Sequence, residues 1–142
     1  MTELHLHPQA AASLQRWHDM LDRRDLTALP ELLAANVVFR SPMAHTPYPG
    51  PAVVSTILNT VIKVFVDFTY YRQLVTADGL SVVLEFSAKV DGRELKGIDM
   101  IRFDEQGKIV DFEVMVRPMS GLQALGAEMG QRLGAYLAAA KA

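Results

Sequence analysis

The chain contains no cysteine. Without a thiol, disulfide bonds, thiolate nucleophiles and cysteine-bound zinc or iron–sulfur centres are all excluded. No apolar run approaches the roughly 18 residues that a membrane-spanning helix requires. Residues 1–8 also lack the basic and apolar regions of a signal peptide. We therefore expect a cytoplasmic protein with no membrane partner.

An excess of charge of one sign is also missing. The chain has 14 basic and 16 acidic residues, a formal net charge of −2, and no run of like charges. Nucleic-acid binding normally requires a basic patch, so no nucleic-acid partner is expected. Half of the 142 residues are hydrophobic, which is enough for a single domain over residues 1–142 with a sizeable core.

The order of the expected elements is typical of the α+β class. Helical spacing of apolar residues predicts helices over 8–24, 26–34, 51–65 and 120–140, and strands are expected over 37–41, 68–75, on both sides of Asp91-Gly92, and after a turn at 104–107. In the last helix, Gly126, Gly130 and Gly134 recur every four residues at a cost to helix stability. This spacing suggests the close approach of another backbone, from the sheet of this chain or from a partner in a homodimer.

Asp91-Gly92 is a strong signal for a two-residue hairpin. The turn predicts four pairs on one face: Ala88 with Leu95, Phe86 with Gly97, Leu84 with Asp99 and Val82 with Ile101. A four-residue turn over 104–107 would then place Phe112 opposite Asp99, with Val110, Val114 and Val116 on the same face. Asp99 would thus lie in the middle of a three-stranded apolar surface.

A carboxylate on an apolar face must be paired, hydrogen-bonded or protonated. Asp99 is therefore the leading candidate for a catalytic residue, as an acid of raised pKa that faces a ligand. The alternative is a structural carboxylate that Trp17, Tyr70, Arg40 or a backbone group satisfies.

The histidines suggest no metal site. His5 and His7 precede the first helix, and His18 lies beside Trp17 toward the polar face of that helix, so no metal is assigned. His45 lies in the proline-rich loop 42–51, either as a general base or as a solvent-exposed loop residue. No phosphate loop or dinucleotide motif occurs, and no cofactor is expected.

The block Gly-Ile-Asp-Met-Ile-Arg-Phe-Asp-Glu-Gln-Gly-Lys-Ile, from Gly97 to Ile109, resembles the NTF2-like (SnoaL-like) superfamily, and ketosteroid isomerase most closely within it. The resemblance extends over residues 14–116. It implies an NTF2-like (cystatin-like) α+β cone, in which N-terminal helices pack on a strongly curved, mostly antiparallel sheet and a C-terminal helix follows. It also implies a deep apolar pocket whose floor carries the strand acid, here Asp99, held neutral so that it can donate to an oxyanion.

The other catalytic positions of the superfamily differ in this chain. In a gap-free alignment, Trp17 occupies the place of the isomerase's helix tyrosine and Ser41 that of its general-base aspartate. A tryptophan can donate an N–H, but a serine hydroxyl does not take a proton unaided near pH 7. Four further positions depart from superfamily patterns. Val116 replaces a pocket tryptophan, Phe112 and Val114 replace a histidine and an aspartate, and Gly97 replaces the arginine of epoxide hydrolases. Steroid isomerisation by the ketosteroid isomerase residue set is therefore not expected.

Two functions remain open. In the first, the cone binds a small apolar, carbonyl-bearing molecule, and any catalysis is that of an isomerase, lyase or hydrolase with Asp99 as acid or oxyanion donor. His45 or a water held by Ser41 would supply the base, and the expected binding residues are Trp17, Ser41, His45, Phe86, Phe112, Val114 and Val116. In the second, the chain is a non-catalytic homodimeric module with a cone filled by side chains. An open cavity of about 300 Å³ or more that reaches Asp99 would favour the first.

Overall fold

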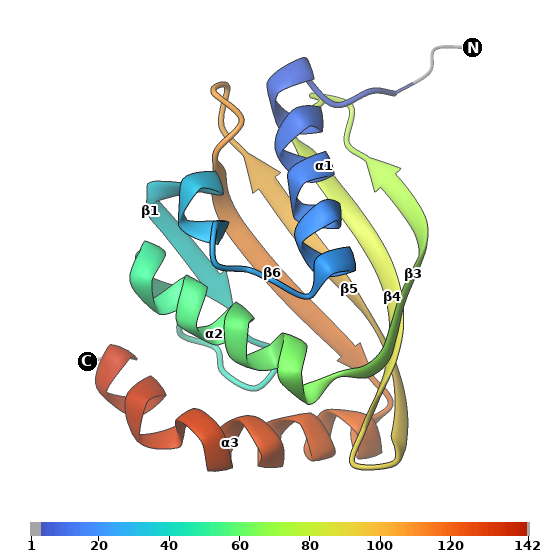
Figure 1. Cartoon of the computed structure of the whole chain (residues 1–142), viewed down its shortest axis with the longest axis vertical. Coiled ribbons are helices and arrows are strands. Elements are labelled where there is room, and N and C mark those ends of the chain that lie inside the picture. The colour runs from blue at the N-terminus through green and yellow to red at the C-terminus, as the bar shows by residue number, and fades with distance from the viewer. Residues whose placement is uncertain (1–3, 142) are drawn as a thin grey trace.

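A six-stranded curved sheet with helices on its inner face forms the protein, as seen in a computed structural model that describes residues 4–141. Helices α1 (Pro8–Arg23) and α2 (Pro51–Val64) lie over one face of the sheet, and α3 (Met119–Lys141) crosses one end of it (Figure 1). The expected α+β cone is confirmed. The expectation of no signal peptide concerns in part residues 1–3, which lie outside the described residues.

The strands follow the spatial order β2-β1-β6-β5-β4-β3. Their bounds are β1 Leu33–Arg40, β2 Tyr48–Pro49, β3 Val66–Val75, β4 Ser81–Val90, β5 Arg93–Phe103 and β6 Ile109–Arg117. Neighbouring strands are antiparallel except β1 and β6, which run parallel. This parallel pair sets Phe39 opposite Phe112 and so joins the first strand of the chain to the last.

The prediction of a second helix over 26–34 is wrong for most of that range. A short 3₁₀ helix, η1, spans only Leu29–Leu32, and β1 begins directly at Leu33. Leu33 pairs with Ile109 of β6. Sheet pairing therefore overrides the helical spacing of the leucines, because local propensity is a weak preference that tertiary contacts outweigh.

The hairpin register between β4 and β5 is confirmed in full, including Leu84 opposite Asp99. The predicted register between β5 and β6 is wrong by two residues. In the structure, Asp99 faces Val114 and Ile101 faces Phe112. One residue of this shift comes from a longer turn, in which the backbone N–H of Asp104 donates to the Lys108 carbonyl at 2.8 Å. The other comes from a bulge next to Arg102. A shift of two keeps every side chain on its expected face.

Gly126, Gly130 and Gly134 of α3 do not meet another backbone within the described residues, whereas a Cβ on Gly121 of the same helix would lie 3.0 Å from the Glu94 carbonyl oxygen of β5. A Cβ on Gly126 would lie 2.5 Å from the Met43 side-chain Cε, and nothing lies within 4 Å of a Cβ on Gly130 or Gly134. For the three glycines spaced by four, the proposed approach to the chain's own sheet is therefore wrong. The other alternative, a homodimer partner, stays a prediction.

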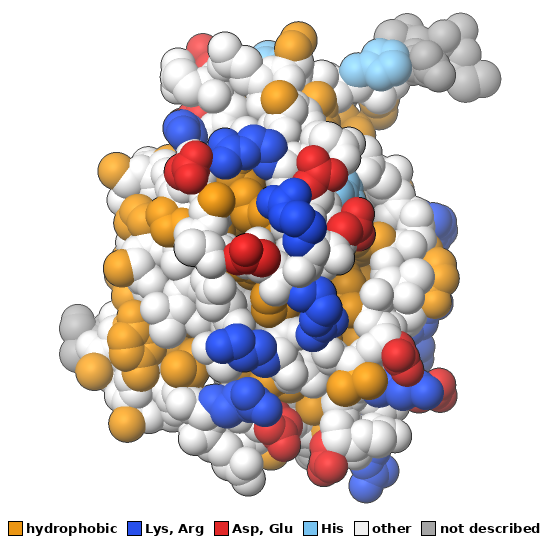
Figure 2. All heavy atoms as spheres, in the orientation of Figure 1, with side chains coloured by type: hydrophobic (Ala, Val, Ile, Leu, Met, Phe, Trp, Pro, Cys, Tyr) orange, Lys and Arg blue, Asp and Glu red, His pale blue; other side chains and the backbone are white. Residues whose placement is uncertain are grey.

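The surface over α1 and its neighbours is charged but balanced. Basic side chains run down the middle of this face with acidic side chains beside them (Figure 2). Arg16 of α1 forms an ion pair with Glu31 of η1, at 3.1 Å. Among the described residues, no helix has the length and apolar character needed to cross a membrane.

Candidate functional site

A cavity of about 600 Å³ lies between the inner face of the sheet and the helices. Its walls come from α1, α2, α3, the loop after β1, and strands β1, β2, β3, β5 and β6, and they are mostly apolar. Small-molecule sites usually span roughly 300 to 1,000 Å³. The cone is therefore open rather than filled by side chains, and Asp99 is among its lining residues.

A chain of hydrogen bonds links three elements at the cavity wall. The Trp17 indole N–H of α1 donates to the Tyr70 hydroxyl of β3 at 3.0 Å, and that hydroxyl donates to Asp99 Oδ2 of β5 at 2.5 Å. Asp99 reaches this point because its strand alternation places it between the buried Leu84 and Val114. The fold thus brings together residues that lie far apart in the sequence.

Burial favours the neutral, protonated form of the Asp99 carboxyl group. The residue is 6% exposed, and burial raises its pKa from 3.8 to about 7, against the opposing effect of the Tyr70 hydrogen bond. Burial and the neighbouring Asp99 raise the pKa of Tyr70 well above 10. Tyr70 is therefore a fixed donor, and Asp99 can keep its proton at a much higher pH than an exposed carboxyl group.

One oxygen of Asp99 remains available to a ligand. Among the described residues, no group donates to Oδ1, and no cation pairs with the carboxylate. Arg40, one of the partners considered from the sequence, instead bonds Asp111 at 3.0 Å. The alternative hypothesis is that other residues satisfy Asp99 as a structural carboxylate. Tyr70 does so at Oδ2 only, so this alternative holds for one of the two oxygens. A protonated Asp99 can donate into the cavity from Oδ1, which suits a carbonyl oxygen.

Four of the seven expected binding residues line the cavity with Asp99: Trp17, Ser41, Phe112 and Val114. Trp17 and Phe112 meet edge to face, with ring centroids 5.3 Å apart. Ser41 Oγ accepts the backbone N–H of Met43 at 3.0 Å. Its hydroxyl oxygen therefore supports the local turn.

The other three expected residues are not among the residues that line this cavity. Phe86 is fully buried beneath Phe68, with ring centroids 4.9 Å apart. A Cβ on Gly97 would lie 2.6 Å from its ring, so Phe86 packs down over that glycine. His45 is exposed on its loop, and Val116 lies half-buried near the end of β6.

Sequence reasoning missed His18 and Asp22, two residues of α1 that also line the cavity. The His18 ring stands edge-on to Tyr70, with centroids 5.4 Å apart. Its four-residue separation from Asp22 was the available signal, because residues at i and i+4 share a helix face. The cavity wall wraps further around α1 than the apolar stripe of that helix indicates.

No metal cluster occurs in the described part of the chain, where no three histidine or acidic side chains gather closely enough to hold an ion.

Residues 14–112 match the family model of the SnoaL-like domain. The chain belongs to the SnoaL-like family. No match is found among curated proteins. The family resemblance inferred from the block around Asp99 is confirmed.

Solved structures agree with the SnoaL-like assignment. A steroid delta-isomerase from Pseudomonas aeruginosa is 69% identical, with a TM-score of 0.91 over 96% of this chain and 99% of that chain. An uncharacterised protein with a cystatin-like fold from Silicibacter pomeroyi is 32% identical, with a TM-score of 0.79 over 85% of this chain and 84% of that one. An NTF2-like protein from Mesorhizobium loti, 21% identical with a TM-score of 0.68 over 81% of this chain and 100% of that one, shares the fold.

Proposed function

We propose that this SnoaL-like protein is an isomerase that binds an apolar ketone in the cavity and moves a carbon–carbon double bond by proton transfer next to the carbonyl. Asp99 would donate a hydrogen bond to the carbonyl oxygen. The observation that carries the proposal is the Asp99 carboxyl itself, which is buried in the cavity wall and, among the described residues, accepts a donor at Oδ2 but not at Oδ1. The name of the 69% identical relative, a steroid delta-isomerase, supports a fused-ring ketone as the substrate class.

The chemistry follows from where charge develops. Removing a proton beside a carbonyl places negative charge on the carbonyl oxygen, and a preformed donor in an apolar site stabilises that charge strongly. Tyr70 fixes the carboxyl through Oδ2, so little reorganisation is needed during the reaction. The mostly apolar walls would bind the rings of the ligand while this one polar group orients it.

The proposal is tested by following a Δ5-3-ketosteroid as its double bond moves into conjugation with the ketone, which changes the ultraviolet absorbance. Asp99→Leu removes the donor and should lower kcat by about 10²- to 10³-fold, the usual effect of losing one such donor. Asp111→Asn is the matched control, because Asp111 pairs with Arg40 and is not a lining residue. It should retain the parent rate.

Binding can be measured separately through fluorescence, because Trp17 is the single tryptophan and lines the cavity. The conjugated ketone product should change that fluorescence on titration. A parent protein that neither binds nor converts the ketosteroid, or an Asp99→Leu variant as fast as the parent, would refute the proposed function.

A further inference from the structure

Proton transfer beside a carbonyl requires a base, and Ser41 cannot supply it. Six titratable side chains line the cavity: His18, Asp22, Arg24, Tyr48, Tyr70 and Asp99. Arginine and tyrosine do not accept a proton near neutral pH. Asp99 is assigned to the carbonyl oxygen. Within the described residues, His18 and Asp22 are therefore the candidates for the base.

His18 is the better placed of the two. Its ring packs edge-on against Tyr70, whose hydroxyl bonds Asp99, so the imidazole lies beside the group that would hold the carbonyl. Asp22 is exposed to solvent, whereas His18 is half-buried. A solvated carboxylate is a weak base, and an imidazole is the side chain best matched to proton transfer near neutral pH.

The charges around His18 come from several elements. Asp19 and Asp22 on α1, and the Gln73 side chain on β3, favour its protonated form, but burial outweighs them and lowers its pKa below 6.5. Tyr70 faces it from β3 as a neutral hydroxyl, and His5 of the N-terminal segment lines a smaller hollow that His18 also reaches. The free imidazole is therefore the main form of His18 at pH 7.

We propose that His18 is the general base of the isomerisation, an assignment that rests on the proposed function. His18 takes the proton from the carbon between the carbonyl and the double bond. The electron pair of that C–H bond forms a double bond to the carbonyl carbon, and the π pair of the carbonyl moves onto its oxygen, which accepts the hydrogen bond of Asp99. The imidazolium then returns the proton to the far carbon of the double bond. The carbonyl re-forms, His18 is neutral again, and no oxidant or reductant is consumed.

The ionisation of His18 and that of Asp99 should limit the reaction rate at opposite ends of the pH range. The rate should rise as His18 loses its proton below pH 6.5 and fall as Asp99 ionises at about pH 7. The pH dependence of kcat/KM reports these ionisations in the free enzyme. Substituting His18 should remove the acidic limb and leave the alkaline limb in place.

The test compares His18→Gln with two matched variants, His45→Gln and Asp22→Asn, using the Δ5-3-ketosteroid in D2O. Exchange of the hydrogens beside the ketone, followed by NMR, reports proton removal directly, and Trp17 fluorescence reports binding. His18→Gln should slow exchange and turnover by about 10²- to 10⁴-fold with binding changed only a few-fold. His45→Gln should exchange at the parent rate, because His45 lies outside the cavity wall. Circular dichroism and melting temperature establish that each variant is folded.

The outcomes separate the two proposals. If the parent exchanges and His18→Gln exchanges equally fast, the base assignment is overturned and the isomerase proposal stands. Loss of exchange in Asp22→Asn alone would also overturn it and assign the base to Asp22. A parent protein that binds no ketosteroid and exchanges no hydrogen overturns the proposed function, and the role of His18 with it.

Discussion

Two aspartates of this protein, Asp99 on β5 and Asp78 in the turn between β3 and β4, each take part in a hydrogen-bond network, and their pKa values shift in opposite directions. The pKa of Asp78 is lowered to about 2, whereas that of Asp99 is raised to about 7. Both start from 3.8. The difference therefore comes from the surroundings, not from the side chain.

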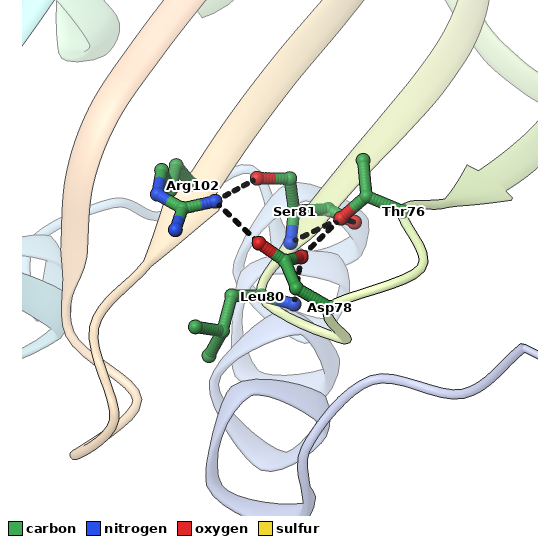
Figure 3. A network of polar contacts seen from close by, with 5 residues as sticks. All are labelled: Thr76, Asp78, Leu80, Ser81 and Arg102. Carbon is green, nitrogen blue, oxygen red and sulfur yellow. Dashed lines mark hydrogen bonds and ion pairs between the residues drawn. The ribbon is translucent and has the colours of Figure 1, made fainter.

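The Asp78 carboxylate is surrounded by donors (Figure 3). It accepts the Thr76 hydroxyl at 2.6 Å, the Leu80 backbone N–H at 3.1 Å and the Arg102 guanidinium at 3.1 Å. Its side chain is 49% exposed, so water also stabilises the charge. These donors hold the ionised form, which ties the turn to the neighbouring strand.

Asp99 has one protein donor and almost no contact with water. A carboxyl group in that position is stabilised mainly in its neutral form. The comparison indicates that a carboxylate surrounded by donors serves the structure, whereas a buried carboxyl with an unused oxygen is available for a ligand. Four substitutions test this contrast.

Asp99→Asn should produce the largest effect, and it should be stabilising at high pH. The folded pKa of Asp99 lies above its unfolded value, so the parent loses stability as pH rises from about 4 to about 7. The rise from 3.8 to about 7 corresponds to roughly 4 kcal/mol as an upper value. The variant should lack this dependence and unfold at higher denaturant concentration than the parent at pH 8. Lower stability of the variant at pH 8 would show that the ionised carboxylate has a partner.

Tyr70→Phe should destabilise the protein by roughly 1 to 3 kcal/mol, the cost of leaving a buried polar group unsatisfied. Without the hydroxyl, Asp99 loses its donor and its pKa should rise further, which NMR of the carboxyl carbon would measure. Tyr71→Phe is the matched control, because that hydroxyl bonds Ser87 on the exposed face. A pKa of Asp99 unchanged in Tyr70→Phe would contradict the role assigned to the hydroxyl.

Asp78→Asn should have a smaller effect of the opposite sign. The folded pKa of Asp78 lies below its unfolded value, so its stabilisation is present above about pH 4 and is lost as pH falls toward about 2. At pH 7 the variant should melt a few degrees lower than the parent, and the two melting temperatures should converge in acid. A variant that melts higher at pH 7 would refute this.

Arg102→Gln should have the smallest effect. Asp78 keeps its bonds from Thr76 and Leu80, and exposed ion pairs contribute little to stability. The Asp78 pKa, followed by NMR, should rise only part of the way and stay below 3.8. A return to the full unperturbed value would mean that the guanidinium alone holds the carboxylate ionised.

The sequence predicts the fold well wherever a short turn sets the register. The two-residue turn at Asp91-Gly92 allows one pairing register between β4 and β5, and all the predicted pairs occur. The turn after β5 could not be predicted in the same way, because Asp104 Oδ1 accepts the backbone N–H groups of Gln106 and Lys108 and closes a longer loop. The bulge beside it leaves no clear pattern in the sequence.

The candidate site was predicted only in part. Strand alternation is enough to place Asp99, but the choice of Tyr70 over Tyr71 depends on a bulge in β3 between Tyr70 and Gln73. His18 lines the cavity and His45 does not, because of how α1 packs against the sheet. Sequence periodicity does not report that packing. Side chains contributed by packing between elements are therefore harder to predict than those fixed within one strand.

The two-residue shift of β6 from its predicted register has a consequence for how chains of this family can vary in length. Removing the single bulged residue beside Arg102 would turn Phe112 and Val114 outward and bring their polar neighbours into the hollow, since side chains alternate along a strand. Removing two residues would shift β6 by two positions along its neighbours and keep each side chain on its present face. Deletions and insertions in this segment should therefore be tolerated in pairs, and sequence alignments that place an odd gap there would misassign the inward-facing positions.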